Sequence, residues 1–206
     1  MNLHKLQIKD EDLLEKLNKF SDFVCDINPK DINFGNKNEI KKYISDEHLE
    51  YLMNNKDEKS NNGAYAVNGF YIYLINLCYN EFSELKDYLD DYLMMMKNDV
   101  NFYYPKGGGL CWHNDAHVGE HNLFLHYSED GSGHFEYLDP KTNQKVRIQD
   151  TKGWSITYGF FAGKNDNEDV IWHNVYAGAG CRLTINYKLP TKHKKLFEEI
   201  IQQLKG

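Results

Sequence analysis

The stretch Gly180–Tyr187, GCRLTINY, alternates polar and apolar side chains. Because successive side chains of a strand point to opposite faces, this pattern predicts a strand with two unlike faces. The apolar face consists of Leu183, Ile185 and Tyr187, and the polar face of Arg182, Thr184 and Asn186. A guanidinium that faces the interior of a small barrel is costly unless it is paired. Its partner is either a dicarboxylate ligand, bound through two hydrogen bonds, or one of the chain's own Asp or Glu residues.

The C-terminal half of the chain, from Asn101, consists of short apolar runs separated by Gly, Asn and Asp turns. The runs are NFYYP, LCWHND, NLFLHYS, HFEYLD, KVRIQD, GWSITYGFF, VIWHNVYA and CRLTINYKL. Eight short strands at this spacing are typical of an antiparallel sandwich or barrel. We therefore expect a core built mainly of strands over residues 99–190.

The N-terminal segment, residues 1–98, has helical periodicity instead, and we expect it to support the strands from outside. Apolar residues recur at helical spacing in Asp10–Phe20, Asn38–Met53 and Glu81–Lys97. The run GFYIYLINL, residues 69–77, predicts one strand here, and residues 192–204 predict a C-terminal helix. The fold class is therefore α+β, with a mainly β core, in a single domain over residues 1–206.

The composition limits the cellular compartment and the partners that we expect. The formal net charge is −7, which disfavours nucleic acid as a partner. The first residues contain no apolar segment of a secretory signal, and no run approaches the ~20 apolar residues that cross a bilayer. The four cysteines are widely spaced and form no CxxC pair. We therefore expect a cytoplasmic protein with free thiols and no membrane partner.

A metal-binding pattern lies in the second of the strand runs, Trp112-His113-Asn114-Asp115. His113 and Asp115 are two residues apart, so on a strand they share a face. The run VIWHNV supplies a third ligand, His173. Two histidines and one carboxylate form the facial triad of non-haem Fe(II) oxygenases, which leaves three positions open. An isolated HxD is a weak signal in a chain with nine histidines, most of which we expect to be surface or core groups.

The spacing of the whole set is more specific. His173 follows the HxD pair by about sixty residues, and Arg182 follows His173 by nine. This arrangement resembles the 2-oxoglutarate/Fe(II)-dependent dioxygenase superfamily over about Asn101 to Leu189. The approach Tyr103–Gly109, YYPKGGG, is most similar to the prolyl-hydroxylase branch. The resemblance implies a double-stranded β-helix (jelly-roll) core, with Fe(II), 2-oxoglutarate and O2 as cofactor and cosubstrates. It also allows ascorbate as an accessory.

The resemblance assigns roles to seven residues. It makes His113, Asp115 and His173 the iron ligands and Arg182 the partner of the distal carboxylate of 2-oxoglutarate. Thr184 would assist Arg182, and Tyr104 would line the cosubstrate pocket. The strand after HxD often contributes a Tyr in this family; here NLFLHYS offers His126 or Tyr127, and alternation favours His126, on the face of Asn122 and Phe124.

The implied activity is hydroxylation of a prolyl or other side chain of a protein or peptide. The carboxylate of Asp115 favours hydroxylation over halogenation, which needs that position open. One alternative is a hydroxylase of a free amino acid or metabolite. Another is a non-catalytic, cupin-like metal-binding module, which would have no use for Arg182. Of the residues outside the site, we expect His117, His121 and His134 in loops, and Trp112 and Trp172 in core packing.

Overall fold

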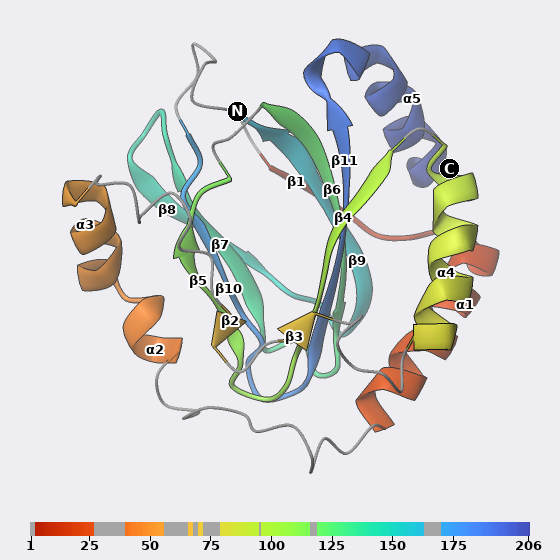
Figure 1. Cartoon of the computed structure of the whole chain (residues 1–206), viewed down its shortest axis with the longest axis horizontal. Helices are drawn as coiled ribbons and strands as arrows, with labels where there is room; N and C mark the ends of the chain where they lie inside the picture. The colour runs from red at the N-terminus through yellow and green to blue at the C-terminus, as the bar shows by residue number, and fades with distance from the viewer. Residues whose placement is uncertain are drawn as a thin grey trace.

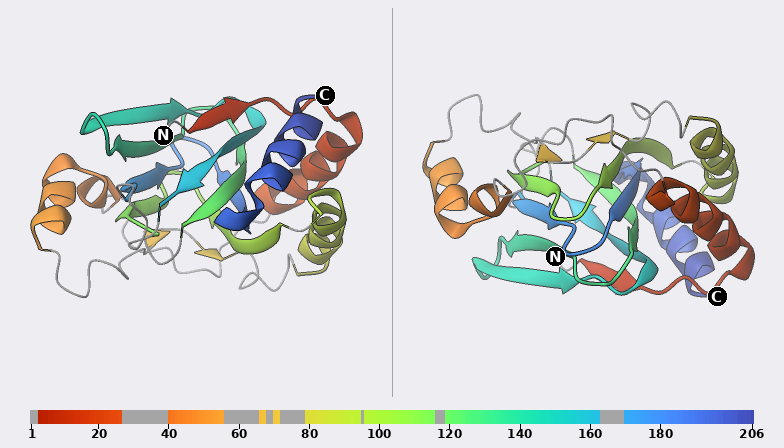
Figure 2. Two further views of the ribbon diagram at one scale, coloured as in Figure 1. Left: turned by 90° about the horizontal axis from the view of Figure 1, so that it is seen from above. Right: turned by 90° about the horizontal axis from the view of Figure 1, so that it is seen from below.

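The computed structural model of the chain describes residues 3–26, 40–55, 66–67, 70–71, 79–94, 96–115, 119–162 and 170–206. Within them, two antiparallel sheets face each other and helices cover their outer sides (Figure 1). Figure 1 shows α2 and α3 beside one sheet and α1, α4 and α5 beside the other, and Figure 2 shows the same layers from above and below. The architecture is thus a mixture of helix and antiparallel sheet in which strands dominate.

The larger sheet has six strands in the order β1-β9-β6-β11-β4-β3. Its strands are β1 His4–Leu6, β9 Gly153–Phe161, β6 Glu120–Ser128, β11 Arg182–Pro190, β4 Lys97–Tyr104 and β3 Phe70–Tyr71. The smaller sheet has five strands in the order β2-β5-β10-β7-β8. Its strands are β2 Ala66–Val67, β5 Gly109–His113, β10 His173–Tyr176, β7 His134–Asp139 and β8 Gln144–Gln149. All eight strands expected from the C-terminal half are present.

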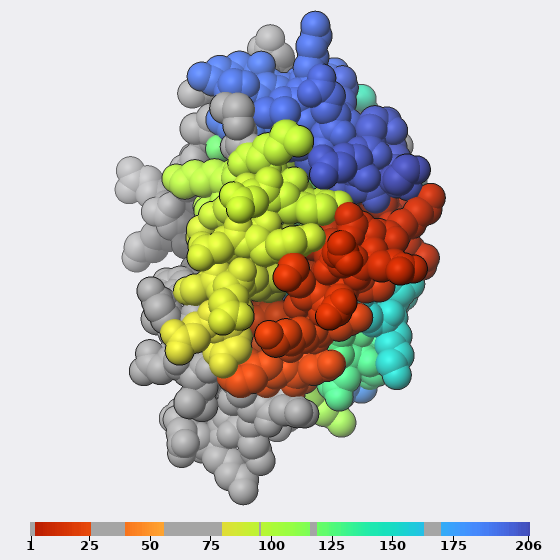
Figure 3. All heavy atoms as spheres, turned by 90° about the vertical axis from the view of Figure 1, so that its right-hand side faces the viewer, coloured from red at the N-terminus to blue at the C-terminus, as the bar shows by residue number. Residues whose placement is uncertain are grey.

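Three helices cover the outer face of the larger sheet, side by side in Figure 3: α1 Glu11–Asp26, α4 Tyr79–Tyr92 and α5 Lys194–Lys205. They form one core cluster with the apolar face of β11, Leu183, Ile185 and Tyr187, all fully buried. The spacing of Leu13, Leu17, Phe20 and Val24 gives α1 its buried stripe. The outward face of β11 is therefore the apolar one that its alternation predicts, which leaves the polar face to the space between the sheets.

Several helix boundaries differ from the expectations: α1 continues to Asp26, six residues beyond the expected end at Phe20, and three other differences have a local description. Residues 40–54 form two helices, α2 Ile40–Tyr43 and α3 Asp46–Asn54, because Ser45 caps α3 by accepting from the His48 N–H at 3.2 Å. Helix α4 ends at Tyr92, before Met94 with its φ of 54°. Residues 191–193 form the 3₁₀ helix η4, and α5 follows.

The N-terminal segment contributes strands as well as helices, which corrects its description as helical support. Strands β1, β2 and β3 all belong to it, and β4 begins at Lys97, before the expected boundary. Of the strand expected over residues 69–77, only β3 lies in the described residues. The N-terminal segment therefore completes both sheets.

The cysteines correct a further expectation. Cys25 at the end of α1 and Cys181 before β11 form a disulfide, with their Cα atoms 6.6 Å apart, so the prediction of free thiols is wrong for these two. Cys111 is a buried thiol, and Cys78 lies outside the described residues. Disulfides persist mainly in oxidising compartments, so free thiols no longer support a cytoplasmic location, which stays a prediction. No helix among the described residues is long and apolar enough to cross a membrane.

Candidate metal centre and cosubstrate pocket

The two histidines of the expected triad lie on neighbouring strands of the smaller sheet. His113 ends β5 and His173 begins β10, and the two residues are direct partners in the β5–β10 ladder. Their ring centroids are 4.0 Å apart, and both side chains are buried. The pairing register therefore brings together two imidazoles separated by about sixty residues of sequence.

Hydrogen bonds to the backbone orient both rings. Nδ1 of His113 lies 2.8 Å from the carbonyl oxygen of Cys111, and Nδ1 of His173 lies 3.3 Å from that of Ile171. A carbonyl oxygen can only accept, so each neutral ring carries its proton on Nδ1. This leaves the lone pair of each Nε2 directed away from the backbone, as in histidines that bind a metal.

Asp115 completes the group from just beyond the end of β5. Its Oδ1 lies 3.9 Å from Nε2 of His113, and its Oδ2 lies 3.8 Å from Nε2 of His173. One ligand atom from each residue falls within 4.8 Å of the others, so a single ion can contact all three. The side chain of Asp115 is 33% exposed and those of the histidines 4%. The centre therefore opens to solvent on the side of its carboxylate.

Burial also keeps His173 in the protonation state that a metal requires. Desolvation lowers the pKa of His173 to about 3, and the neighbouring His113 adds to this effect, against an opposing pull from Asp115. The ring is therefore neutral at physiological pH, and its Nε2 is available as a ligand. The donor set and its protonation fit a divalent iron ion.

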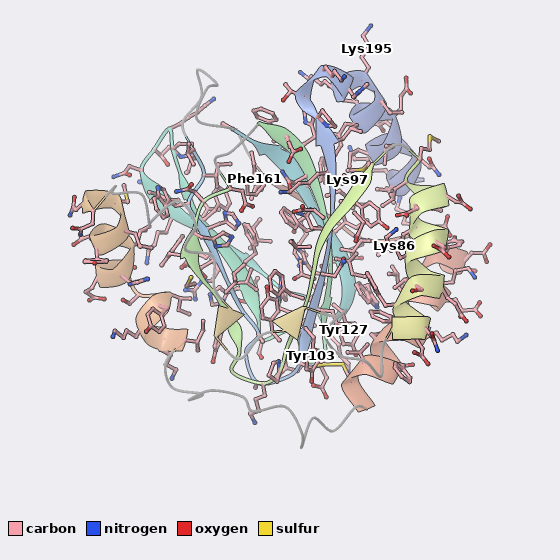
Figure 4. The ribbon with its side chains drawn as sticks, in the orientation of Figure 1. Lys86, Lys97, Tyr103, Tyr127, Phe161 and Lys195 are labelled. Atoms are coloured by element: carbon pink, nitrogen blue, oxygen red, sulfur yellow. A yellow bond between two sulfur atoms is a disulfide. The ribbon has the colours of Figure 1, made fainter. Side chains whose placement is uncertain are left out.

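A cavity of about 90 Å³ adjoins the triad between the two sheets. Besides the triad, its lining includes three of the four expected cosubstrate residues, Tyr104, His126 and Thr184. The remaining lining is mostly apolar: Val100, Phe102, Leu110, Phe124, Phe135 and Val175, with Asp99 and Asn186. In Figure 4 Phe161 lies between the sheets, and its ring meets His173 edge-on at 5.1 Å. The metal residues therefore face a small, largely apolar interior.

Strand register explains why these cosubstrate residues come together. Thr184 on β11 pairs with His126 on β6 on one side, and Arg182 pairs with Tyr104 on β4 on the other. Residues two apart share a face, so Arg182 and Thr184 form adjacent rows of the inward surface. The expectation that His126 shares a face with Phe124 is confirmed, since both line the cavity.

Arg182 already has a partner within the chain. Its Nε donates to Oδ2 of Asp150 at 2.8 Å, its Nη2 lies 3.4 Å from Oδ1, and its Nη1 donates to the hydroxyl oxygen of Thr184. Both partners of this ion pair are buried, with side chains 0% and 5% exposed. Of the two partners that the sequence left open, the structure shows the internal carboxylate. A guanidinium has five N–H groups, so two remain beyond these three bonds.

His126 is one of two cavity residues, with Asn186, that each have a buried polar atom without a hydrogen-bond partner among the described residues. Its Nδ1 lies 3.4 Å from Oγ1 of Thr184, whereas its buried Nε2 has no hydrogen-bond partner in the described part of the chain. Burial, with Arg182 and Lys5 nearby, lowers its pKa well below the usual value, so the ring is neutral. A buried nitrogen of this kind is satisfied by a polar ligand atom or a water.

The predictions for the other tryptophan and histidine residues were confirmed only in part. Trp112 packs with Leu49 and Leu138 on the side away from the cavity, and Trp172 packs against the same cluster, so both are core residues as predicted. The prediction of loops is wrong for His121 and His134, which are buried in β6 and β7. The prediction for His117, a loop, falls outside the described residues.

Comparison with known proteins gives structural neighbours only. No protein-family model matches the sequence, and no curated protein matches it significantly. One solved structure that resembles the chain is a viral collagen prolyl hydroxylase from Paramecium Bursaria Chlorella virus-1 in a 2OG complex. It is 13% identical with a TM-score of 0.33, and the match covers 71% of this chain and 90% of that one.

Another is a prolyl hydroxylase from Trichoplax adhaerens in complex with a peptide fragment of the hypoxia inducible factor oxygen degradation domain. It is 15% identical with a TM-score of 0.36, and the match covers 91% of this chain and 96% of that one. Similarity at this level assigns no function. The function of this chain must therefore be inferred from its own residues.

Proposed function

We propose that this chain is a 2-oxoglutarate- and Fe(II)-dependent dioxygenase, a single domain with a double-stranded β-helix core. Its substrate in this proposal is a prolyl or other side chain of a protein or peptide. The observation that carries the proposal is one cavity lined both by the three residues that could hold a metal ion and by Thr184, whose hydroxyl accepts from the guanidinium of Arg182.

The residues of the cavity fit both groups. His113, Asp115 and His173 would hold the iron. Iron with 2-oxoglutarate and O2 supplies hydroxylation, in which one oxygen atom enters the substrate and the other enters succinate as CO2 leaves. The protein's contribution is orientation: the two N–H groups of Arg182 beyond its bonds to Asp150 and Thr184 would donate to ligand oxygens, and so would Nε2 of His126 when it carries the ring proton, since it has no partner among the described residues.

The size of the cavity supports a macromolecular substrate. At about 90 Å³ it is well below the ~300–1,000 Å³ of pockets that enclose a drug-sized ligand. A small cosubstrate therefore fills it, and the molecule to be oxidised must approach from the open side at Asp115. A protein or peptide can present one side chain there while the rest of its chain stays outside. The choice of a prolyl residue rests on the YYPKGGG resemblance.

The first alternative is a hydroxylase of a free amino acid or metabolite. It uses the same site and differs only in the substrate that enters from the open side at Asp115. The second alternative, a non-catalytic metal-binding module, would leave Arg182 as a structural partner of Asp150. That buried ion pair is the specific observation in its favour. The three hypotheses are distinguished by turnover.

The deciding experiment is anaerobic loading with Fe(II), exposure to air with 2-oxoglutarate, and measurement of succinate, alone and with panels of peptides, amino acids and oligonucleotides. We expect succinate formation that peptides stimulate. Stimulation by amino acids alone would favour the small-molecule hydroxylase. No succinate under any condition, from folded protein that retains iron, would favour the binding module.

A further inference from the structure

Arg182 bonds the cavity residue Thr184 but does not itself line the cavity, and two further charged residues that the sequence patterns did not single out lie near it: the buried Asp150 and the exposed Lys5. Asp150 follows β8 and takes the Nε edge of the guanidinium, at 2.8 Å. Lys5 on β1 donates from Nζ to the carbonyl oxygen of Gln149, the residue before Asp150, at 2.7 Å. Lys5 comes from the edge strand of the larger sheet, and Asp150 follows the edge strand of the smaller sheet. Both lie near Arg182, the proposed partner of the distal carboxylate.

The position of Asp150 is tightly defined. Its backbone N–H donates to the carbonyl oxygen of Gly133 at 3.0 Å. A Cβ atom on Gly133 would lie 2.6 Å from Oδ2 of Asp150, the same oxygen that accepts from Nε of Arg182. The absence of a side chain at residue 133 therefore leaves room for the carboxylate. Because Asp150 binds the Nε edge, the free N–H groups of Arg182 are on Nη1 and Nη2, and Nη1 also donates to the cavity residue Thr184.

Lys5 belongs to the inward surface of the larger sheet. It is the direct partner of Thr157, which in turn pairs with Phe124 of the cavity lining. Residues directly opposite each other on neighbouring strands share a face, so the Lys5 side chain leaves β1 on the side of the cavity. Burial lowers the pKa of Lys5, while Asp150 raises it and Arg182 lowers it, so these charges interact.

The formal charges at this end sum to one positive charge. Arg182 and Lys5 are cationic, Asp150 is anionic, and His126 is neutral because its pKa lies well below the usual value. The ion pair of Arg182 with Asp150 alone would be neutral and would attract a further carboxylate only weakly. One surplus positive charge matches a single carboxylate group.

We propose that Asp150 and Lys5 determine how strongly and how selectively this site binds the distal carboxylate of the cosubstrate. Asp150 is a positioning residue that holds the guanidinium with two N–H groups free, and its negative charge moderates the attraction. Lys5 supplies the positive charge that makes the site selective for an acid with a second carboxylate. This inference rests on the proposed function, because it concerns the same cosubstrate.

The two charges predict effects of opposite sign. Lys5→Met removes a partly solvated cation and should weaken 2-oxoglutarate binding roughly threefold or more. Asp150→Asn keeps an oxygen that accepts from Nε of Arg182 but removes a buried anion, so it should tighten binding about tenfold. Neither change should alter the binding of 2-oxovalerate, a 2-oxo acid without the distal carboxylate.

The test is calorimetric titration of both acids into protein loaded with Mn(II) in place of Fe(II), which measures affinity without turnover. The matched control is Lys195→Met, which removes an exposed lysine that projects outward from α5 (Figure 4). Thermal melting checks that each variant folds. We expect the ratio of the two dissociation constants to move in opposite directions for Lys5→Met and Asp150→Asn, and not to move for the control.

The outcomes separate this inference from the proposed function. Wild-type protein that binds metal but neither acid would refute the proposed function, and the inference with it. Binding of 2-oxoglutarate with the same selectivity in wild type, Lys5→Met and Lys195→Met would refute the inference alone. Weaker 2-oxoglutarate binding by folded Asp150→Asn would also refute it, and if that variant does not fold, Lys5→Met decides.

Discussion

Replacing Arg182 by Met tests whether the guanidinium serves a ligand as well as the fold. Met keeps much of the side-chain length but leaves the carboxylate of Asp150 buried, 5% exposed, without its ionic partner. Breaking a buried ion pair from one side costs about 3–5 kcal/mol in the free energy of unfolding. With a urea dependence of about 2 kcal/mol per M, the unfolding midpoint should fall by roughly 1.5–2.5 M.

The double variant Arg182→Met/Asp150→Asn separates the ion pair from the other contacts of Arg182. Removing both charges leaves no uncompensated anion, so we expect it to recover at least half of the stability lost by Arg182→Met. Urea unfolding, monitored by circular dichroism, gives the free energy of unfolding of the wild type, of Arg182→Met, of Asp150→Asn and of the double variant. A loss below about 1 kcal/mol for Arg182→Met, or a double variant no more stable than the single one, would show that the pair contributes little.

Metal and ligand binding complete the test. The hydrogen bonds of Arg182 go to Asp150 and Thr184, so Arg182→Met should bind metal as the wild type does while losing 2-oxoglutarate affinity at least about a hundredfold. Both are measured by titration of the folded variant, without urea, at a temperature well below its melting point. Loss of the metal instead would mean that Arg182 supports the triad and not a cosubstrate.

Three further predictions concern the triad, the buried histidines and the disulfide. Asp115→Ala should lower metal affinity at least about tenfold with little change in melting temperature, because this ligand is partly exposed; Co(II) titration measures it. The folded-state pKa of His134 is about 4, lowered mainly by burial, so the unfolded chain binds its proton more readily and stability should fall as pH drops from about 6.5 toward 4. Urea unfolding across this pH range should show that the free energy of unfolding declines less in His134→Gln than in the wild type. An equal decline would mean that other groups cause the pH dependence. Cys25→Ser and Cys181→Ser should each cost about 2–5 kcal/mol, and the double variant no more than either; additive losses would contradict a shared bond.

The parts of the structure that follow from local patterns could be predicted. The alternation in GCRLTINY correctly indicated which face of β11 packs under the helices, and turn residues delimited all eight C-terminal strands. The HxD spacing singled out His113 and Asp115, although β5 ends at His113 and Asp115 joins the group from beyond the strand, and His173 joined them by strand pairing. Helix ends were less predictable, because a single capping residue such as Ser45 divides one periodic stretch into two helices.

The sequence by itself therefore determined the strand-rich core, the candidate metal ligands and the inward direction of Arg182, since these depend on period-two alternation and residue spacing. Only the tertiary structure decided what surrounds Arg182. Asp150 bonds it from just after β8, Lys5 on β1 bonds the neighbouring Gln149, and Cys25 joins Cys181 across 156 residues. Such contacts depend on how the sheets and helices pack against one another. The sequence between the partners contains no local pattern from which this packing could be predicted.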